Sequence, residues 1–371
     1  MISNIYIKNF KAFQEAEIPP CQLNIFTGLN GMGKSTFLQS LLLLRQSYLQ
    51  NTLLNKGLLL NGDYIKIGKG KDAFSMYGTD EDIITFEVEW NEEMEFRGEF
   101  FTQDEFDLLP IHQIQTSDNQ VFQQALFQNN CQLLSAERIS PKTFFPASAY
   151  YVEQIHSLGS QGEFTVHFIA KNRAKDIPIK ALAHPKANSL ALLAQLDAWL
   201  GEISPNVRLT SILYDEFDIA RLSYRFDVGT DSTEEMKPPN VGFGLTYALP
   251  VVTAVLFAHP GDLLIIENPE SHLHPQGQAR LGKLFAKAAE NGVQLFIETH
   301  SDHLLNGVRV ATKHKDISPE NVGIFFFERN PEKEEHLTEI VQPFIDENGR
   351  IDKWPKSFFD ESDNQLDELL K

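Results

Sequence analysis

The chain begins with apolar and polar residues that alternate in the two-residue period of β-strands. This pattern predicts an opening strand from Ile2 to Phe10 and a returning strand from Glu15 to Ile18, which two prolines then end. Leu23–Phe26 is a short apolar run, typical of a buried strand. Phe37–Leu44 carries leucines on most sides, which predicts a helix with a largely buried surface.

Residues 51–239 are patterned less regularly. Ile83–Trp90 alternates well and predicts a strand, and Met94–Phe100 predicts a second strand after it. Residues 103–130 are polar and rich in Gln and Asn, so we expect a loop-and-helix insertion there. The other elements predicted in this region are two short strands about an Asn-Gly turn at Leu58–Ile65, a core strand at Leu133–Arg138, a helix at Ser189–Leu200, a strand-like segment at Val207–Phe226 and a mobile loop at Asp227–Asn240.

Strands and helices alternate most clearly in the second half of the chain. An apolar strand at Asp262–Glu267 ends in an acidic residue, and a strand at Val293–Ile297 leads to His300. Ser301 is suited to cap the next helix. Because strands alternate with helices, we expect the α/β class, with a mostly parallel sheet covered on both faces. Further predicted elements are helices at Leu245–Phe257 and Gln276–Ala289 and a strand at Val322–Phe327.

Composition narrows the class of protein. A length of 371 residues favours two closely joined domains over one simple core. The net charge of −19 argues against a protein that coats nucleic acid, since phosphate binding needs clustered Lys and Arg. The sequence has neither a run of about eighteen apolar residues nor a signal peptide, so we expect no membrane attachment. Cys21 and Cys131 do not make a disulfide framework, which favours a cytoplasmic protein.

The stretch Gly28-Leu29-Asn30-Gly31-Met32-Gly33-Lys34-Ser35-Thr36 matches the P-loop pattern G-x-x-x-x-G-K-[ST] at every fixed position. It follows a predicted strand and begins a predicted helix, so its backbone N–H groups and the helix dipole form an anion site. We expect Lys34 to reach the β- and γ-phosphates of ATP, and the Ser35 hydroxyl to bind Mg²⁺. The residues expected to bind nucleotide here are Asn30, Gly31, Gly33, Lys34, Ser35 and Thr36.

Two later stretches extend the candidate chemistry. Glu267, at the end of an apolar strand, is the acid that a P-loop requires for its Mg²⁺ shell, and His300 is placed to contact a γ-phosphate or the attacking water. Gly242 and Gly244, with Thr246, form a second potential phosphate site at a helix start. One P-loop needs one such cradle, so the second makes sense if it closes over nucleotide bound by another subunit.

Together these motifs resemble the ABC-type ATPases of the overcoming-lysogenization-defect (OLD) class of the AAA family, which are relatives of chromosome-maintenance and recombination-repair heads. The tail Ile351–Glu361, with its Trp-Pro and Phe-Phe-Asp-Glu residues, looks like the closing motif of a bacterial subgroup of uncharacterised function. The resemblance is weak over residues 51–239, apart from Glu137-Arg138 at a strand end near the nucleotide. It rests on the P-loop, the Gly242-Phe243-Gly244 turn, the stretch Glu267–Pro275 and Glu298-Thr299-His300-Ser301.

The resemblance implies a P-loop NTPase fold like that of ABC or chromosome-maintenance heads, with a mixed sheet flanked by helices and an inserted α+β region. Gly28–Thr36 would be the Walker A loop, Glu267 the Walker B acid, Gly242–Thr246 the signature turn and His300 the switch histidine. ATP would lie between two head-to-tail protomers of a homodimer. The implied segments are residues 1–50 and 240–345 of the ATPase domain, the insertion 51–239 and the tail 346–371.

Two residues depart from the family pattern. Asn268 stands where the usual catalytic Glu lies, and Tyr247 stands where relatives often have Gln. We therefore expect a slow ATPase, with Glu270 as a candidate replacement for the missing base. His272 and His274 lie beside acids, where packing is favoured over a metal site because supporting ligands are not evident. Full-length OLD nucleases continue into a Toprim nuclease domain, and we expect none in this chain.

Three functions are open at this point. The first is a dimeric ATP-dependent switch that controls a separately encoded effector, by analogy in bacterial defence against phage or mobile DNA. The second is a DNA-repair-type head that grips DNA directly. The third is a nucleotide-sensing scaffold that does not hydrolyse ATP, which Asn268 favours. The candidate DNA-binding residues are Lys66, Lys69, Lys71, Lys142, Lys171, Arg173 and Lys175.

Overall fold

The computed structural model describes the chain except for residues 80–81, 92, 330–336, 356–357 and 371. The described chain forms two compact units. The predicted insertion, residues 51–239, contributes to both units, and its role as a separate lobe stays a prediction. Unit 1 comprises Met1–Gln128, Gly323–Phe344 and Ile351–Lys371, and unit 2 comprises Asn129–Val322 and Ile345–Arg350.

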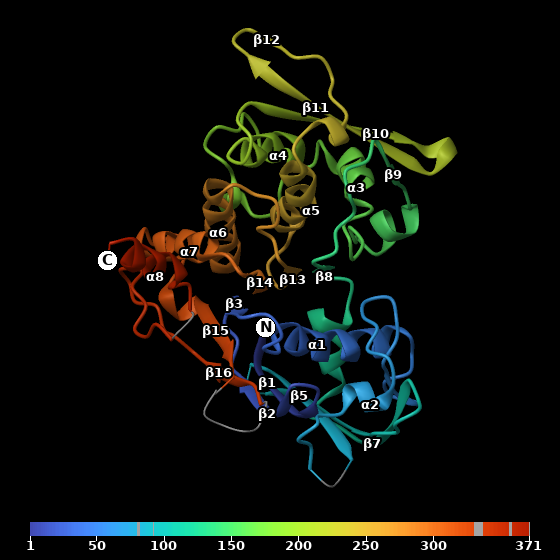
Figure 1. Cartoon of the computed structure of the whole chain (residues 1–371). Coiled ribbons are helices and arrows are strands. Elements are labelled where there is room, and N and C mark those ends of the chain that lie inside the picture. The colour runs from blue at the N-terminus through green and yellow to red at the C-terminus, as the bar shows by residue number, and fades with distance from the viewer. Residues whose placement is uncertain (80–81, 92, 330–336, 356–357, 371) are drawn as a thin grey trace. The chain divides into compact units, whose positions relative to one another are not determined.

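Unit 1 contains a six-stranded antiparallel sheet, part of which is drawn in blue in Figure 1. Both predicted opening strands and the predicted pair of strands after residue 83 are confirmed. Buried aromatic side chains, such as Trp90 and Phe96, cover one face of the sheet and supply its core. In spatial order the strands are β2 (Phe13–Ile18), β1 (Ile2–Phe10), β5 (Ile83–Trp90), β6 (Met94–Phe101), β7 (Leu108–Thr116) and β4 (Gly57–Leu59).

Two predictions in this sheet are wrong. The polar stretch 103–130 is no helical insertion: it forms β7 and two 3₁₀ turns, Asn119–Gln123 and Ala125–Phe127. Most of the polar side chains of β7 point away from the core, so its composition hides a strand. The Asn-Gly hairpin is also predicted at the wrong place. β4 pairs with β7, and the chain reverses over residues 62–65, where the Gly62 N–H donates to the Ile65 carbonyl at 2.9 Å beside an isolated bridge from Asn61 to Lys66.

A second group of strands in unit 1 carries the P-loop. β3 (Leu23–Gly28) is buried along its whole length and leads into α1 (Lys34–Leu49), as predicted. Next to β3 lies β15 (Val322–Glu328), which pairs antiparallel with β16 (Glu339–Val341). The Phe26 ring stacks on the Phe325 ring with the ring centroids 5.4 Å apart, and it also contacts the Phe37 ring of α1. Such aromatic pairs contribute roughly 0.5–1.5 kcal/mol each beyond their burial, and here they hold strand and helix together.

The predicted tail motif packs on β15. Phe358 is fully buried, with its ring 5.3 Å from that of Phe326, and the Trp354 ring lies 5.0 Å from Phe358. Lys356 and Ser357 of the motif lie outside the described residues. A last helix, α8 (Glu361–Leu369), follows. The tail motif therefore packs against β15, the strand next to β3, which leads into the P-loop.

Unit 2 holds three parallel strands: β8 (Cys131–Leu134), β13 (Leu263–Glu267) and β14 (Gln294–Glu298). Their register places Glu267 opposite Glu298, so both strands end at the same level. Ser301 caps α7 by accepting from the Leu304 N–H at 2.9 Å, as predicted. The helices of this group are α5 (Phe243–Phe257) and α6 (Pro275–Glu290), each close to its predicted range, and α7 (Asp302–Lys313), the helix predicted after Ser301.

The rest of unit 2 is built on an antiparallel hairpin, β10 (Val207–Tyr214) and β11 (Ile219–Val228), drawn beside α3 and α4 in Figure 1. α4 (Leu192–Leu200) lies within the predicted helix, whereas α3 (Thr165–Asn172) was not predicted. Two ion pairs attach the loop after β11 to that strand: Glu235 of the loop lies 2.7 Å from Arg221 and 2.7 Å from Arg225. The remaining elements of the chain are β9 (Phe144–Pro146), β12 (Asp231–Ser232), α2 (Gly70–Ala73), a π-helical turn at Tyr150–Gln154 and 3₁₀ turns at Lys180–Leu182, Asp215–Phe217, Pro238–Asn240 and Pro319–Asn321.

Within the described ranges, we find no helix that combines the length and the hydropathy of a membrane span.

Candidate functional site

The P-loop half-site, residues 28–36 of unit 1, is shaped by three glycines. Gly28, Gly31 and Gly33 have φ angles of 139°, 76° and 94°, a region that side chains with a Cβ rarely adopt. A Cβ on Gly28 would also lie 2.2 Å from the main-chain oxygen of Phe327. The sequence therefore folds into a tight turn at the end of β3, and the chain leaves this turn directly into α1.

Lys34 is folded back onto the turn that it follows. Its side chain is buried, and its Nζ donates to the carbonyl oxygens of Gly28 and Leu29, both at 2.9 Å. No side chain caps the start of α1, and the first turn of that helix contains no acidic residue. Ser35 is exposed at the same helix end. The positive end of the helix dipole thus has no side-chain anion of its own, as in a phosphate site.

The remaining predicted residues of the turn differ in their exposure. Asn30 and Gly31 are exposed, whereas Thr36 is buried and faces the protein. Arg329, which sequence reasoning missed, donates from Nη2 to the Gly31 carbonyl at 3.0 Å. It follows β15 directly, and the one signal that pointed to it is its place just after a predicted apolar strand.

The acidic half-site of unit 2, formed by Glu267, Asn268, Glu270, His300 and Arg138, lies where β13 and β14 end. The Glu267 carboxylate accepts from the Ala136 N–H at 2.8 Å. Burial raises the pKa of Glu267, while this N–H and the nearby Arg138 lower it. A partly buried carboxylate of this kind gains from a bound cation, which offsets the cost of removing its charge from water.

Arg138, just after β8, is the buried cation of this half-site. It is 4% exposed, and its guanidinium donates to the main-chain oxygen of Asn268 at 3.0 Å and to that of Glu267. Burial lowers the pKa of Arg138 to about 10, and the carboxylates of Glu270 and Glu267 oppose this shift. The side chain therefore keeps its charge at neutral pH.

The turn after Glu267 is held in an uncommon conformation. Asn268 has a φ of 43°, and its N–H donates to the Glu298 carbonyl at 2.8 Å. The Glu270 Oε1 atom accepts from the main-chain N–H of His300 at 2.8 Å, so the Glu270 side chain and the backbone of His300 are brought together. The Asn268 Oδ1 and Glu270 Oε2 atoms are buried and have no hydrogen-bond partner among the described residues. Two acceptors are thus available to a water or a cation.

The predicted signature turn presents backbone rather than its hydroxyl. Gly242 is exposed at the start of α5, and a Cβ there would meet no atom within 4 Å. Gly244 is packed closely instead, because its Cβ would lie 2.6 Å from the His272 carbonyl oxygen. Thr246 is 4% exposed, and its hydroxyl lies inside the unit near Tyr224. In this conformation the open part of the turn is therefore Gly242, together with the half-exposed Phe243 ring.

The two histidines after Glu267 have packing and capping roles. The His272 ring lies 4.7 Å from the Tyr247 ring and 5.6 Å from the Phe243 ring. His274 caps α6, since its Nδ1 atom accepts from the Gln276 N–H at 3.3 Å. In the described part of the chain, no group of three or more His, Cys, Asp or Glu side chains is arranged to hold a metal ion.

Two family models match this chain. The family described as "AAA domain, putative AbiEii toxin, Type IV TA system" matches residues 23–306. The family described as "Protein of unknown function (DUF3696)" matches residues 317–369. A comparison with curated proteins found no match.

Two solved structures share the fold. One is the SmcHead bound to the C-winged helix domain of ScpA: it has 13% identity, a TM-score of 0.56, and a match covering 92% of this chain and 97% of that chain. The other is an Smc head domain with an extended coiled coil, bound to the C-terminal domain of ScpA from Pyrococcus furiosus. It has 12% identity, a TM-score of 0.54 and coverage of 100% and 99%. The predicted P-loop NTPase fold of the chromosome-maintenance head type is confirmed.

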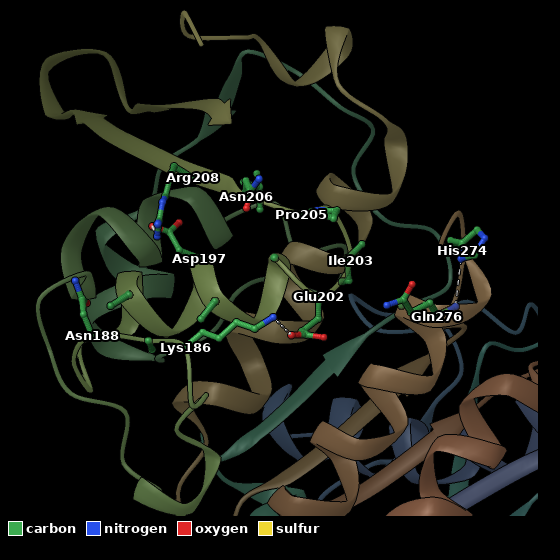
Figure 2. A pocket seen from close by; sticks show the side chains of 16 residues that line it. Lys186, Asn188, Asp197, Glu202, Ile203, Pro205, Asn206, Arg208, His274 and Gln276 are labelled. Atoms are coloured by element: carbon green, nitrogen blue, oxygen red, sulfur yellow. Dashed lines mark hydrogen bonds and ion pairs between the residues drawn. The ribbon is translucent and has the colours of Figure 1, made fainter. Parts of the chain in front are cut away.

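Unit 2 also contains a cavity of about 600 Å³ that sequence reasoning did not suggest, between α4, the start of β10 and the start of α6 (Figure 2). Lys186 donates to Glu202 at 3.0 Å on one side of it. Asp197 lies on another side, where it accepts from the Leu209 N–H at 2.9 Å and lies 3.6 Å from Arg208. Positive and negative groups alternate around the cavity, so its lining does not select one sign of charge.

The buried Asp197 carboxyl makes the stability of the chain depend on pH. Burial raises its pKa from 3.8 to about 6, which the Leu209 N–H and Arg208 only partly offset. The folded state then holds this proton more tightly than the unfolded state. Its contribution to stability is therefore largest below about pH 4, and it is lost as the pH rises to about 6.

We expect Asp197→Asn to remove this loss of stability at rising pH. At neutral pH the free energy of unfolding of the variant should exceed that of the wild type by roughly 1–3 kcal/mol, because each unit of pKa difference is worth about 1.4 kcal/mol. Denaturant unfolding at pH 4, 5, 6 and 7 measures the difference. Asp227→Asn is the matched control, since Asp227 pairs with the same arginine at 2.7 Å but is more exposed. Parallel pH curves for the wild type and Asp197→Asn would contradict this account.

Proposed function

Because the chain belongs to the AAA-domain family that matches residues 23–306, and is thus a P-loop ATPase of the ABC and AAA type, we propose that it binds ATP with Mg²⁺ and hydrolyses it slowly as a dimeric switch. The single observation that carries this proposal is the P-loop half-site. A buried lysine lies there beside an uncapped helix start that has no acidic residue. Such a site has the charge and the backbone donors that a phosphate chain needs.

The residues present fit both ligands. At the P-loop, the Lys34 ammonium can exchange two carbonyl oxygens for phosphate oxygens, and the exposed Ser35 hydroxyl can bind Mg²⁺. In unit 2, the partly buried Glu267 carboxylate is the second proposed ligand of Mg²⁺. Mg²⁺, when bound, neutralises charge on the phosphates.

The acidic half-site supports slow hydrolysis. An amide cannot take a proton from water as a carboxylate does, so Asn268 is assigned to orient the attacking water. Glu270 keeps one carboxylate oxygen without a partner among the described residues, and we propose that this oxygen accepts the proton. The main-chain N–H of His300 donates to the other Glu270 oxygen. Turnover then depends on a base that is displaced by two residues from its usual place.

Dimer formation is proposed from the signature turn. Its open glycine, Gly242, lies at the start of a fifteen-residue helix that no side chain caps. This is the arrangement that the first turn of α1 also shows, and it suits a phosphate approaching from outside the protomer. We propose that each protomer presents this turn to the nucleotide of the other, so that ATP joins the two.

The biological role follows the same reasoning. We propose that the ATP-joined dimer controls a separately encoded effector protein, in defence against phage or mobile DNA. The matching family is described by a toxin of toxin–antitoxin systems, and one similar head was solved with a partner domain bound. Equal phage plating on cells that carry the wild type or Lys34→Ala would count against the defence role.

Direct DNA binding is a weaker alternative. Of the seven basic residues considered, Lys69 and Lys71 pair with Glu105, and Lys171 pairs with Glu153. Three of the seven candidates are thus engaged by two acidic groups, which lowers the local positive charge and disfavours a basic groove. Salt-dependent binding of duplex DNA would restore this alternative. A scaffold that senses ATP without hydrolysis stays the third candidate, and Asn268 is the residue that favours it.

We predict that Lys34→Ala lowers the affinity for ATP by about 10- to 100-fold, because it removes charge-assisted bonds to phosphate. Titration with a fluorescent ATP analogue measures the loss, and circular dichroism checks that the fold persists. Lys56→Ala is the control, since Lys56 is an exposed lysine of the same unit. Equal affinities for both variants would mean that the P-loop does not hold nucleotide.

A bulky side chain at Gly242 should separate binding from assembly. We predict that Gly242→Trp keeps ATP affinity within about threefold, since no atom of the protomer lies near a new Cβ there, but blocks ATP-dependent dimers. Light scattering with and without ATP and Mg²⁺ gives the mass. Val310→Trp places the same bulk at an exposed position of α7 and should leave assembly intact. Dimerisation of Gly242→Trp at the wild-type level would exclude the proposed sandwich.

Glu270→Gln tests the displaced base. We expect phosphate release to fall by about 10²–10⁴-fold, the usual worth of a general base, with ATP binding preserved. Glu320→Gln, at an exposed residue of the same unit, is the control. Asn268→Glu should not accelerate hydrolysis, because a φ of 43° suits asparagine better than glutamate. Full activity in Glu270→Gln would show that Glu270 is not the base, and rapid turnover in Asn268→Glu would show that residue 268 holds the place of the base.

A further inference from the structure

Arg138 takes up an arrangement that neither the P-loop pattern nor the matching family explains. Its side chain is 4% exposed at the end of β8, and its two terminal nitrogens bond two successive carbonyls, those of Glu267 and Asn268. Both acceptors are uncharged main-chain oxygens. The arginine is therefore not simply the ion-pair partner of a single acid, although Glu270 and Glu267 act on its charge.

The two carbonyls belong to the turn that carries the proposed chemistry. A residue with a φ of 43° is costly for most side chains and is kept only where surrounding contacts determine it. The Asn268 N–H is held from the other side by the Glu298 carbonyl at 2.8 Å. Arg138 therefore closes a clamp, in which both main-chain groups of residue 268 and the carbonyl before it are fixed.

Fixing this backbone also fixes two side-chain atoms. The Asn268 Oδ1 and Glu270 Oε2 atoms are buried and lack partners among the described residues. Their direction is set by the turn that Arg138 holds and by the His300 N–H that binds the second Glu270 oxygen. A planar guanidinium can hold two acceptors in a set direction, whereas an ammonium acts as a point charge.

We propose that Arg138 is a positioning residue for hydrolysis: its guanidinium holds the 267–268 backbone so that Asn268 and Glu270 face the attacking water. This inference rests on the proposed function, in which those two side chains act on water. Arg138 touches neither water nor phosphate in this scheme. Its loss should therefore lower the rate of the chemical step and leave ATP binding largely unchanged.

The test compares the wild type, Arg138→Lys and Arg138→Gln in the full chain. We expect kcat for phosphate release to fall by about 10- to 100-fold in Arg138→Lys and further in Arg138→Gln, as for other residues that orient reacting groups. KM and the dissociation constant of a fluorescent ATP analogue should stay within about threefold. Thermal melting reports the fold of each variant.

Arg45 provides a matched control. It is another buried arginine whose guanidinium donates to two main-chain carbonyls, those of Leu126 and Gln128, at 2.7 and 2.8 Å. Arg45→Lys should lower the melting temperature about as much as Arg138→Lys while leaving kcat unchanged. An equal fall of kcat in both lysine variants would overturn the inference, because general loosening would explain it.

Other outcomes are equally informative. Wild-type kcat in Arg138→Lys, or a rise of KM at constant kcat, would overturn the positioning role. A wild-type chain that binds the ATP analogue and releases no phosphate would overturn it too, while nucleotide binding stands. Failure of the wild type to bind the analogue would instead remove the proposed function on which the inference rests.

Discussion

Main-chain oxygens in the turns after buried strands need donors, and in each unit a buried cation supplies them. Lys34 bonds the carbonyls of Gly28 and Leu29, and Arg138 bonds those of Glu267 and Asn268. The positive-φ residues of the first turn are glycines, which adopt this conformation without strain, whereas the second turn has Asn268 at a φ of 43°, which surrounding contacts hold. In both half-sites a buried charge is compensated by main-chain carbonyl oxygens.

The two cations differ in what they can do next. Lysine carries a compact charge on a flexible stem, so Lys34 can leave its carbonyls when better acceptors arrive. Phosphate oxygens are such acceptors, because charge-assisted hydrogen bonds are roughly twice as strong as neutral ones. Arginine presents a rigid fork, so Arg138 is suited to hold one backbone arrangement through a reaction cycle. One half-site is thus built to exchange partners and the other to stay as it is.

The backbone conformation at position 268 gives a second reason why asparagine stands there. Judged by chemistry alone, an amide in place of a glutamate is a loss of the base. Its left-handed φ of 43° shows a further constraint, since asparagine adopts this region more readily than glutamate. The turn then brings Glu270 against the His300 N–H, with one oxygen left over. A slow ATPase is consistent with both readings.

The sequence by itself determined the features that depend on near neighbours. The P-loop, the acid at the end of β13, the Ser301 cap and the alternation of strands with helices were all predicted, because glycine spacing, strand periodicity and capping act over a few residues. The α/β class followed from them, and the head-type P-loop NTPase fold from the family resemblance that these motifs carry.

Only the tertiary structure decided which distant groups meet. β7 exists because β6 and β4 pair with a polar segment that has no strand pattern of its own. Thr246 belongs to the predicted signature turn and was expected to bind nucleotide, yet the packing of α5 buries its hydroxyl. Arg138 is 129 residues from Glu267 along the chain, and no local pattern shows that it clamps the turn after that acid. Long-range pairing and burial set these contacts, and neither can be read from the spacing of residues in one segment.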